Sequence, residues 1–215
     1  MTSMNALSFN VQNRHPSTCS IFKRLIDIVG SIVGLLILAI VFIPVAIAIK
    51  LDSPGSIFYS QLRYGLYGRP FKIRKFRSMI KEAEILKARV PNLAAGPIFK
   101  NKHDPRITRV GNFLRKTSLD ELPQFWNVLV GEMSLVGTRP PSRDEVIHYS
   151  SRHWQRLNVK PGITGEWQVS GRSKVTDFEA IIELDLRYQK RWSPWYDISI
   201  IFKTIYVVLA QLGAY

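Results

Sequence analysis

The feature that most constrains this chain is a run of 22 residues, 28–49, without a charged side chain. As one α-helix the run would be roughly 33 Å long at about 1.5 Å per residue, enough to cross the hydrocarbon core of a bilayer. A cleaved signal peptide fits poorly, because the run starts late, is longer than a normal signal core and precedes no clear cleavage site. We therefore expect a membrane segment that stays in the protein.

Pro44 lies inside this run. A proline removes one backbone donor and disfavours helical geometry at the preceding residue, here Ile43. We therefore expect the membrane helix to kink or break at Pro44.

The flanks of the run predict how it sits in the membrane. Lys23 and Arg24 precede it, and Lys50 and a strongly basic remainder follow it. The positive-inside rule would keep both ends on the cytoplasmic side, which predicts a re-entrant hairpin. The alternative is a kinked single span with the N-terminal tail outside, and protease or thiol-label access to that tail in sealed vesicles would separate the two.

These observations predict three parts: an N-terminal tail of residues 1–22, a re-entrant membrane helix of residues 23–51, and a cytosolic domain of residues 52–215. The whole chain of 215 residues suffices for one domain with a core and is too short for two domains with several spans. Its 30 basic and 16 acidic residues leave a net charge of +14. The expected partners are therefore anionic: nucleic acid, phosphate-bearing substrates or an acidic membrane face.

The cytosolic part predicts an α+β fold that is mainly helical. Short strands are expected at 56–63 and 71–77, the second with Phe71 and Ile73 on one face until Lys75 breaks the alternation. The aromatic tail at 195–212 predicts a helix in the headgroup layer, with an ordinary core helix as the alternative. Further helices are expected at 79–89, 122–130, 144–156 and 177–191.

Two adjacent acids, Asp120 and Glu121, follow a cluster of arginines and stand at the start of a predicted helix. Ser118 and Glu121 have the spacing of a capping box; if Pro123 is the first helical residue instead, both acids lie in the turn before the helix. Acids at a helix start are commonly structural. A carboxylate held ionised by arginines can also attack phosphorus or hold a divalent cation, which offsets the repulsion between two anions.

A basic stretch surrounds this position: residues 72–116 contain 13 basic and three acidic side chains. The simplest interpretation is a solvated face that attracts anionic lipid headgroups. A subset of arginines can also clamp phosphate, because the guanidinium fork matches phosphate oxygens.

Several motifs occur together in one order. They are Asp52-Ser-Pro-Gly55, Phe71-Lys-Ile-Arg-Lys-Phe-Arg-Ser-Met79, Asp104-Pro-Arg-Ile-Thr108, Ser118-Leu-Asp-Glu-Leu122, Gly131-Glu-Met-Ser-Leu-Val-Gly137, Pro161-Gly-Ile-Thr-Gly165 and Trp167-Gln-Val-Ser-Gly-Arg172. With these motifs the chain resembles the bacterial sugar transferases known as monotopic polyprenyl-phosphate phosphoglycosyl transferases, in their minimal catalytic form. The resemblance extends from Lys23 to about Val208.

The resemblance implies an undecaprenyl-phosphate sugar phosphotransferase that works in two steps. Asp120 would attack the phosphorus next to the sugar of a UDP-sugar, release UMP and carry the phosphosugar until undecaprenyl phosphate collects it. Glu121, with Asp120, would hold Mg²⁺, the implied cofactor. Arg115 and Arg139 match basic positions near the phosphates, and Arg109 is a third candidate.

Weaker candidates for nucleotide-sugar contact are Arg172, Asp185 and Tyr188. Asp185 and Tyr188 are three residues apart on one predicted helix face, and pairing with Arg187 and Lys190 is their alternative.

The resemblance also implies a location, the cytoplasmic face of the bacterial inner membrane, and a role in starting exopolysaccharide, capsule, O-antigen or glycoprotein glycans. Membrane lipids are expected partners and nucleic acid is not, because no nucleic-acid-binding module is present. An oligomer is compatible with the sequence, and the sugar is left open. Three rival hypotheses are a non-catalytic protein that binds anionic lipid, a nucleic-acid-binding protein, and an enzyme that uses a ternary complex without a covalent intermediate.

Overall fold

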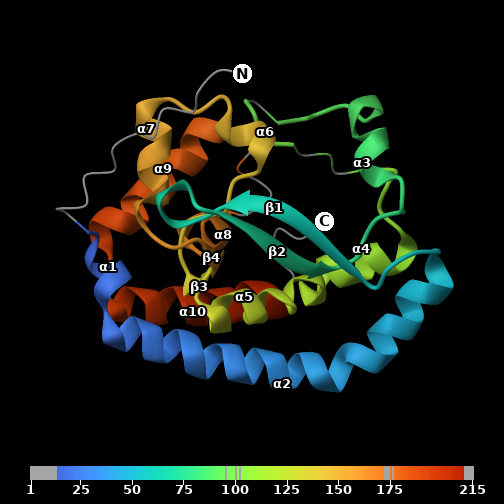
Figure 1. Ribbon diagram of the computed structural model, residues 1–215, viewed down its shortest axis with the longest axis horizontal. Coiled ribbons are helices and arrows are strands. Elements are labelled where there is room, and N and C mark those ends of the chain that lie inside the picture. The colour runs from blue at the N-terminus through green and yellow to red at the C-terminus, as the bar shows by residue number, and fades with distance from the viewer. Residues whose placement is uncertain are drawn as a thin grey trace.

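The computed structural model describes residues 14–94, 96–99, 101, 103–171, 175 and 177–210. Over these residues the fold is mainly helical with two small sheets, which confirms the predicted α+β class. Figure 1 shows the longest helix, α2 (Ile21–Asp52), running beneath the rest of the chain, with the short helix α1 (Pro16–Cys19) at its start. By length and apolar composition α2 could cross a membrane or be embedded in one.

Helix α2 continues through Pro44 instead of breaking there. Figure 1 shows it bending toward the domain in its C-terminal part, so the expected kink is present as a bend within one helix. Its start is defined by Ser20, whose side-chain oxygen accepts a hydrogen bond from the Lys23 backbone N–H at 3.2 Å.

Both ends of α2 contact the same domain. Near its start, Lys23 Nζ lies 2.6 Å from Asp197 Oδ2 of helix α10 (Pro194–Leu209). At its end, Asp52 Oδ2 accepts a hydrogen bond from the Val110 N–H of helix α4 (Arg109–Lys116) at 2.9 Å. Helix α2 therefore lies along one face of the domain, and its two ends are on the same side.

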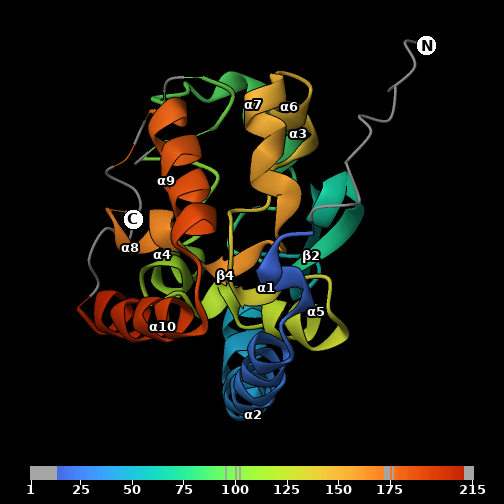
Figure 2. The ribbon, with the colours of Figure 1, turned by 90° about the vertical axis from the view of Figure 1, so that its left-hand side faces the viewer.

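The outward side of α2 is apolar and continues onto its neighbours. Figure 2 shows α10 on one side of α2 and helix α5 (Gln124–Val130) on the other. The helix expected at 195–212 is confirmed as α10, and its position in the headgroup layer stays a prediction. Exposed large apolar side chains on these elements include Leu25, Val29, Ile32, Leu36, Ile40, Ile43, Ile47, Trp126, Val130, Trp195, Phe202, Ile205, Tyr206 and Leu209.

Both sheets have two strands. Strands β1 (Phe58–Tyr64) and β2 (Pro70–Phe76) are antiparallel and joined through a 3-10 turn, η1 (Leu66–Gly68). In β2, Phe71 and Ile73 are buried while their neighbours face outward, as the alternation predicted. Strands β3 (Ser134–Val136) and β4 (Gly162–Thr164) pair in parallel.

Two predicted helices are divided in the structure. The segment expected at 79–89 contains α3 (Ala83–Leu86) and the 3-10 turn η2 (Lys87–Arg89). The segment expected at 144–156 contains α6 (Arg143–Val146), α7 (Ser151–Trp154) and η4 (Gln155–Asn158), because Ser150 begins a new helix with its own capping box. Helices α8 (Glu166–Val169) and α9 (Phe178–Arg191) complete the fold.

One cluster of buried apolar residues packs α2 against β2 and α4. Val45 and Ile49 of α2 pack with Phe76 of β2 and Leu114 of α4. This packing holds the end of α4 between the apolar helix and the first sheet.

Gly111 lets α4 approach the chain that leaves β2. A Cβ at this position would overlap the backbone carbonyl of Ser78. We expect Gly111→Ala to destabilise the protein by about 1–3 kcal/mol, although Ala is the better helix former, because the clash is with backbone. Thermal unfolding in detergent measures the effect. Asn112→Ala, at an exposed position of the same helix, is the control, and equal stability of the two variants would contradict the argument.

Candidate active site

A cavity of about 950 Å³ opens between the first sheet, the end of α4 and the start of α8. Asp120 and Glu121 both line it, together with Arg115 and Arg139. Other basic side chains on its wall are Arg63, Lys75, Arg77, Lys81, Lys87 and Arg106. The structure therefore brings the two predicted acids and two of the three predicted phosphate-binding arginines into one basic cavity.

The acids lie in a 3-10 turn, η3 (Leu119–Glu121), just before α5. The chain turns left-handed at Ser118, with φ 58°, and Pro123 occupies the cap position of α5. Ser118 makes no side-chain capping hydrogen bond, so the capping-box alternative is wrong. Both acids do lie in the turn that precedes the helix, as the other alternative predicted, but the first helical residue is Gln124 and not Pro123.

Each acid faces basic side chains. Asp120 is only 7% exposed, and Glu121 Oε1 accepts a hydrogen bond from Lys75 Nζ at 2.7 Å. Arg115 donates from Nε to Ser78 Oγ at 2.9 Å, which orients its guanidinium. Burial lowers the pKa of Arg115, and the negative charge of Asp120 opposes this shift. The arginine and both carboxylates thus act on one another within the cavity.

A second cluster of charged side chains on the cavity wall is centred on Glu145. Its carboxylate accepts hydrogen bonds from Arg139 Nη1 at 2.6 Å and Nη2 at 3.2 Å, and Arg63 Nη1 lies 3.5 Å away. Burial opposes the charged form of Glu145, but the two arginines outweigh burial and lower its pKa to about 2. Burial and the charge of Arg139 lower the pKa of Arg63 to about 10. One carboxylate therefore fixes two guanidiniums that keep a net positive charge.

The lowered pKa of Glu145 predicts a pH-dependent stability. A shift from 4.5 to about 2 corresponds to about 3 kcal/mol, present above pH 4.5 and lost as the pH falls toward 2. We expect the free energy of unfolding of Glu145→Gln to be lower than that of wild type by about this amount at pH 7. This difference between the two proteins should become smaller below about pH 4.5. Unfolding of both proteins between pH 7 and pH 3 measures it. The exposed Glu183→Gln serves as control, and a gap that does not change with pH would contradict the assignment.

The remaining predicted site residues lie elsewhere. Arg109 is exposed at the start of α4 and does not line the cavity. Asp185 and Tyr188 are each 1% exposed and stay in the core, where Asp185 pairs with Arg156 and Tyr188 donates to Asp197 Oδ1 at 2.8 Å. These partners replace the expected Arg187 and Lys190. Arg172 lies outside the described residues.

The sequence patterns do not predict Lys75, Glu145 or Arg63 as site residues. Lys75 carried a signal, because it is the position at which the alternation of β2 breaks, and its side chain reaches Glu121. Glu145 and Arg63 carried none, since they come from a helix start and a strand that are 82 positions apart in the sequence.

The donor set of the cavity fits Mg²⁺ as an ion shared with substrate. Among the described residues no group of three or more His, Cys, Asp or Glu side chains could hold a metal. Mg²⁺ commonly takes one or two carboxylates and completes its shell with phosphate and water oxygens. Asp120 and Glu121 would supply two such carboxylates, and Glu121 would give up its hydrogen bond from Lys75 to do so.

Comparisons with known proteins show the family to which the chain belongs. The family model described as bacterial sugar transferase matches residues 18–211. The chain is 54% identical over 196 residues to the galactosyl transferase CpsE of Streptococcus agalactiae serotype III (strain NEM316), covering 90% of this chain and 43% of that protein. It is 42% identical over 207 residues to the UDP-glucose:undecaprenyl-phosphate glucose-1-phosphate transferase of Escherichia coli (strain K12), covering 91% of this chain and 42% of that protein.

The chain spans less than half the length of these two relatives. A third relative, the exopolysaccharide production protein ExoY of Rhizobium meliloti (strain 1021), is 38% identical over 199 residues, which cover 90% of this chain and 88% of that protein. On the extent of the family match and these identities, the chain belongs to the bacterial sugar transferase family.

Proposed function

We propose that this chain transfers a sugar 1-phosphate from a UDP-sugar to undecaprenyl phosphate, releasing UMP. The observation that carries the proposal is the pair Asp120 and Glu121 on the wall of a basic cavity large enough for a nucleotide sugar. The names of relatives, such as the undecaprenyl-phosphate galactose phosphotransferase of Salmonella typhimurium, support the same reaction class.

In the first step, an Asp120 carboxylate oxygen attacks the phosphorus that bears the sugar. The bond from this phosphorus to the bridging oxygen breaks, and UMP leaves with that oxygen. The product is an acyl phosphate that links Asp120 to the sugar. Arg115 faces Asp120 and stabilises the charge that develops on the transferred and leaving phosphates.

In the second step, a phosphate oxygen of undecaprenyl phosphate attacks the same phosphorus. The bond to Asp120 breaks, the carboxylate is restored and the lipid diphosphate sugar leaves. Arg139, which also lines the cavity and is held by Glu145, adds further positive charge. Mg²⁺, when bound through Asp120 and Glu121, would neutralise phosphate charge during transfer.

The packing of α4 on α2 supports a lipid acceptor. Arg115 follows Leu114, which packs on Val45 and Ile49 of α2. We infer that α2 enters the membrane from the cytoplasmic side and returns to it, because both of its ends contact the same domain. This arrangement holds the cavity beside the headgroup layer, where a lipid phosphate is found.

A UMP-release assay tests the proposed function. The full chain in nanodiscs that contain undecaprenyl phosphate is given a panel of UDP-sugars that includes UDP-galactose and UDP-glucose, the donors suggested by the relatives. The expected result is UMP release over many turnovers that requires both the lipid phosphate and Mg²⁺, since without lipid only one UMP per protein can be released. If none of the UDP-sugars yields UMP although the protein remains in the membrane, the result would favour the non-catalytic lipid-binding alternative.

A further inference from the structure

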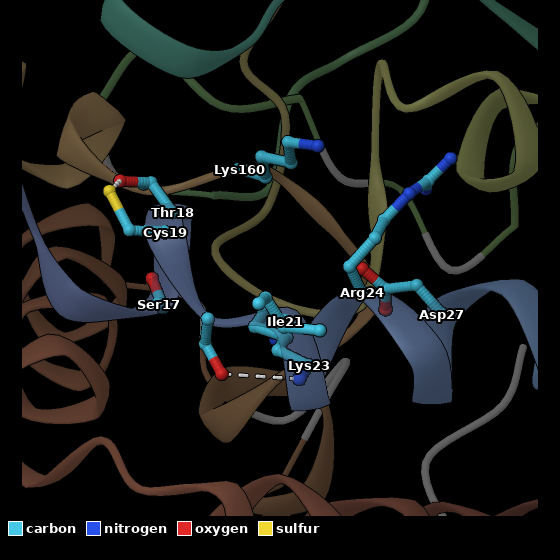
Figure 3. Close-up of a pocket in the computed structure, with 9 residues that line it drawn as sticks. Ser17, Thr18, Cys19, Ile21, Lys23, Arg24, Asp27 and Lys160 are labelled. Atoms are coloured by element: carbon cyan, nitrogen blue, oxygen red, sulfur yellow. Dashed lines mark hydrogen bonds between the residues drawn. The ribbon is translucent and has the colours of Figure 1, made fainter.

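A second pocket, of about 240 Å³, lies at the start of α2 and is separate from the cavity described above. Its wall combines α1, the first turns of α2 and Lys160, which precedes β4. Figure 3 shows Lys160 between Thr18 and Cys19 on one side and Arg24 and Asp27 on the other. The 22 residues 28–49 that follow Asp27 correspond to about 33 Å of helix, so this pocket stands at the far end of α2 from Arg115.

The pocket is lined by three cationic side chains and one carboxylate. Lys23 is fully used, since Nζ donates to Val136 O, the Tyr188 hydroxyl and Asp197 Oδ2. The Asp27 carboxylate is committed to β3, where Oδ1 accepts hydrogen bonds at 2.8 Å from Ser134 Oγ and from the Leu135 N–H. The positive charge available to a ligand is therefore that of Arg24 and Lys160.

Arg24 and Lys160 converge on one point. Arg24 is held in place because Nη1 and Nη2 donate to Val128 O at 2.9 Å and Leu129 O at 2.7 Å. A Cβ built on Gly131 would lie 3.6 Å from Lys160 Nζ and 3.8 Å from Arg24 Nη2. The two charged groups therefore lie beside the same residue, close enough together for one phosphate to contact both.

Lys160 has no hydrogen-bond or ion-pair partner among the described residues. Burial lowers its pKa, and the nearby charge of Arg24 lowers it further; the carboxylate of Asp27 opposes this shift without reversing it. An anion bound between the two side chains would relieve this repulsion.

We propose that this pocket binds the phosphate of an anionic membrane lipid and that Lys160 is the side chain that selects it. A lipid is favoured over a soluble anion because the pocket borders the apolar face of α2. Ile21, which lines the pocket, is 78% exposed, and Leu25, one turn later, is 55% exposed. A headgroup phosphate at Arg24 and Lys160 would leave its acyl chains against these side chains.

Lipid retention measured by native mass spectrometry tests this proposal. The full chain is released from phosphatidylcholine nanodiscs that also contain phosphatidylglycerol. Wild type and Lys160→Arg should retain phosphatidylglycerol, and Lys160→Gln should retain about fivefold less. Lys72→Gln, which removes the same charge from the exposed face of β2, is the matched control and should behave as wild type. UMP release by each variant reports separately whether the catalytic cavity is intact.

Equal retention by Lys160→Gln and Lys72→Gln would overturn the proposal, because the effect would then follow net charge alone. A second arm measures inorganic phosphate binding by calorimetry in pure phosphatidylcholine nanodiscs. Phosphate binding that depends on Lys160, with no preference for phosphatidylglycerol, would assign the pocket to a soluble anion and overturn the lipid assignment.

Discussion

Asp120→Asn is expected to reduce UMP release by about 10³-fold or more, because the amide that replaces the carboxylate is not a nucleophile toward phosphorus. The change keeps the size of a side chain that is 7% exposed, so the fold and the membrane association should persist. Rates are measured with the full chain in nanodiscs that contain undecaprenyl phosphate. Glu183→Gln, a carboxylate-to-amide change on the exposed side of α9, should leave the rate unchanged.

A trapping experiment distinguishes the covalent route from a ternary complex. Without lipid acceptor, UDP-sugar labelled in the phosphate next to the sugar should leave label on the wild-type protein and none on Asp120→Asn. Wild-type protein that turns over normally yet never carries label would support the ternary complex. Full activity of Asp120→Asn would remove Asp120 from the mechanism altogether.

Asp197→Ala is expected to cause the largest loss of stability. Asp197 Oδ2 accepts from Lys23 Nζ at 2.6 Å and Trp192 Nε1 at 3.1 Å, and Oδ1 accepts from Tyr188 at 2.8 Å. Removing this buried carboxylate strands the Lys23 ammonium in the interior at a cost of about 3–5 kcal/mol, or about 6–20 °C in Tm. Thermal unfolding in detergent measures the shift.

An exposed ion pair supplies the comparison. Glu183 pairs with Arg152 at 2.7 Å, with both side chains about half exposed, and Glu183→Ala should cost less than about 1 kcal/mol. If Asp197→Ala were no less stable than Glu183→Ala, the buried network would not be what fastens the start of α2 to α10.

Much of the local structure could be predicted from the sequence because short-range patterns decide it. The uncharged run predicted α2, and the alternation around Phe71 and Ile73 predicted the buried face of β2. The acid pair was found because it follows arginines closely in the chain. The helices at 79–89 and 144–156 were predicted too long, since a capping serine such as Ser150 can divide an amphipathic segment.

The candidate site was only partly predictable, because contacts between distant segments decide which polar side chains face a cavity. Asp185 and Tyr188 had the spacing of a helix face, but their face points into the core toward Arg156 and Asp197. No sequence pattern predicted Glu145 as a site residue, yet its carboxylate binds two arginines that line the cavity.

The sequence by itself determined that this chain has one long apolar helix, a basic body and an acid pair set among arginines, because these are properties of neighbouring residues. Only the tertiary structure decided that both ends of α2 contact one domain, that Arg115 and Arg139 share a cavity with Asp120, and that Arg109 does not. Such outcomes depend on packing and buried charge pairing between segments far apart in the chain, for which local patterns carry no signal.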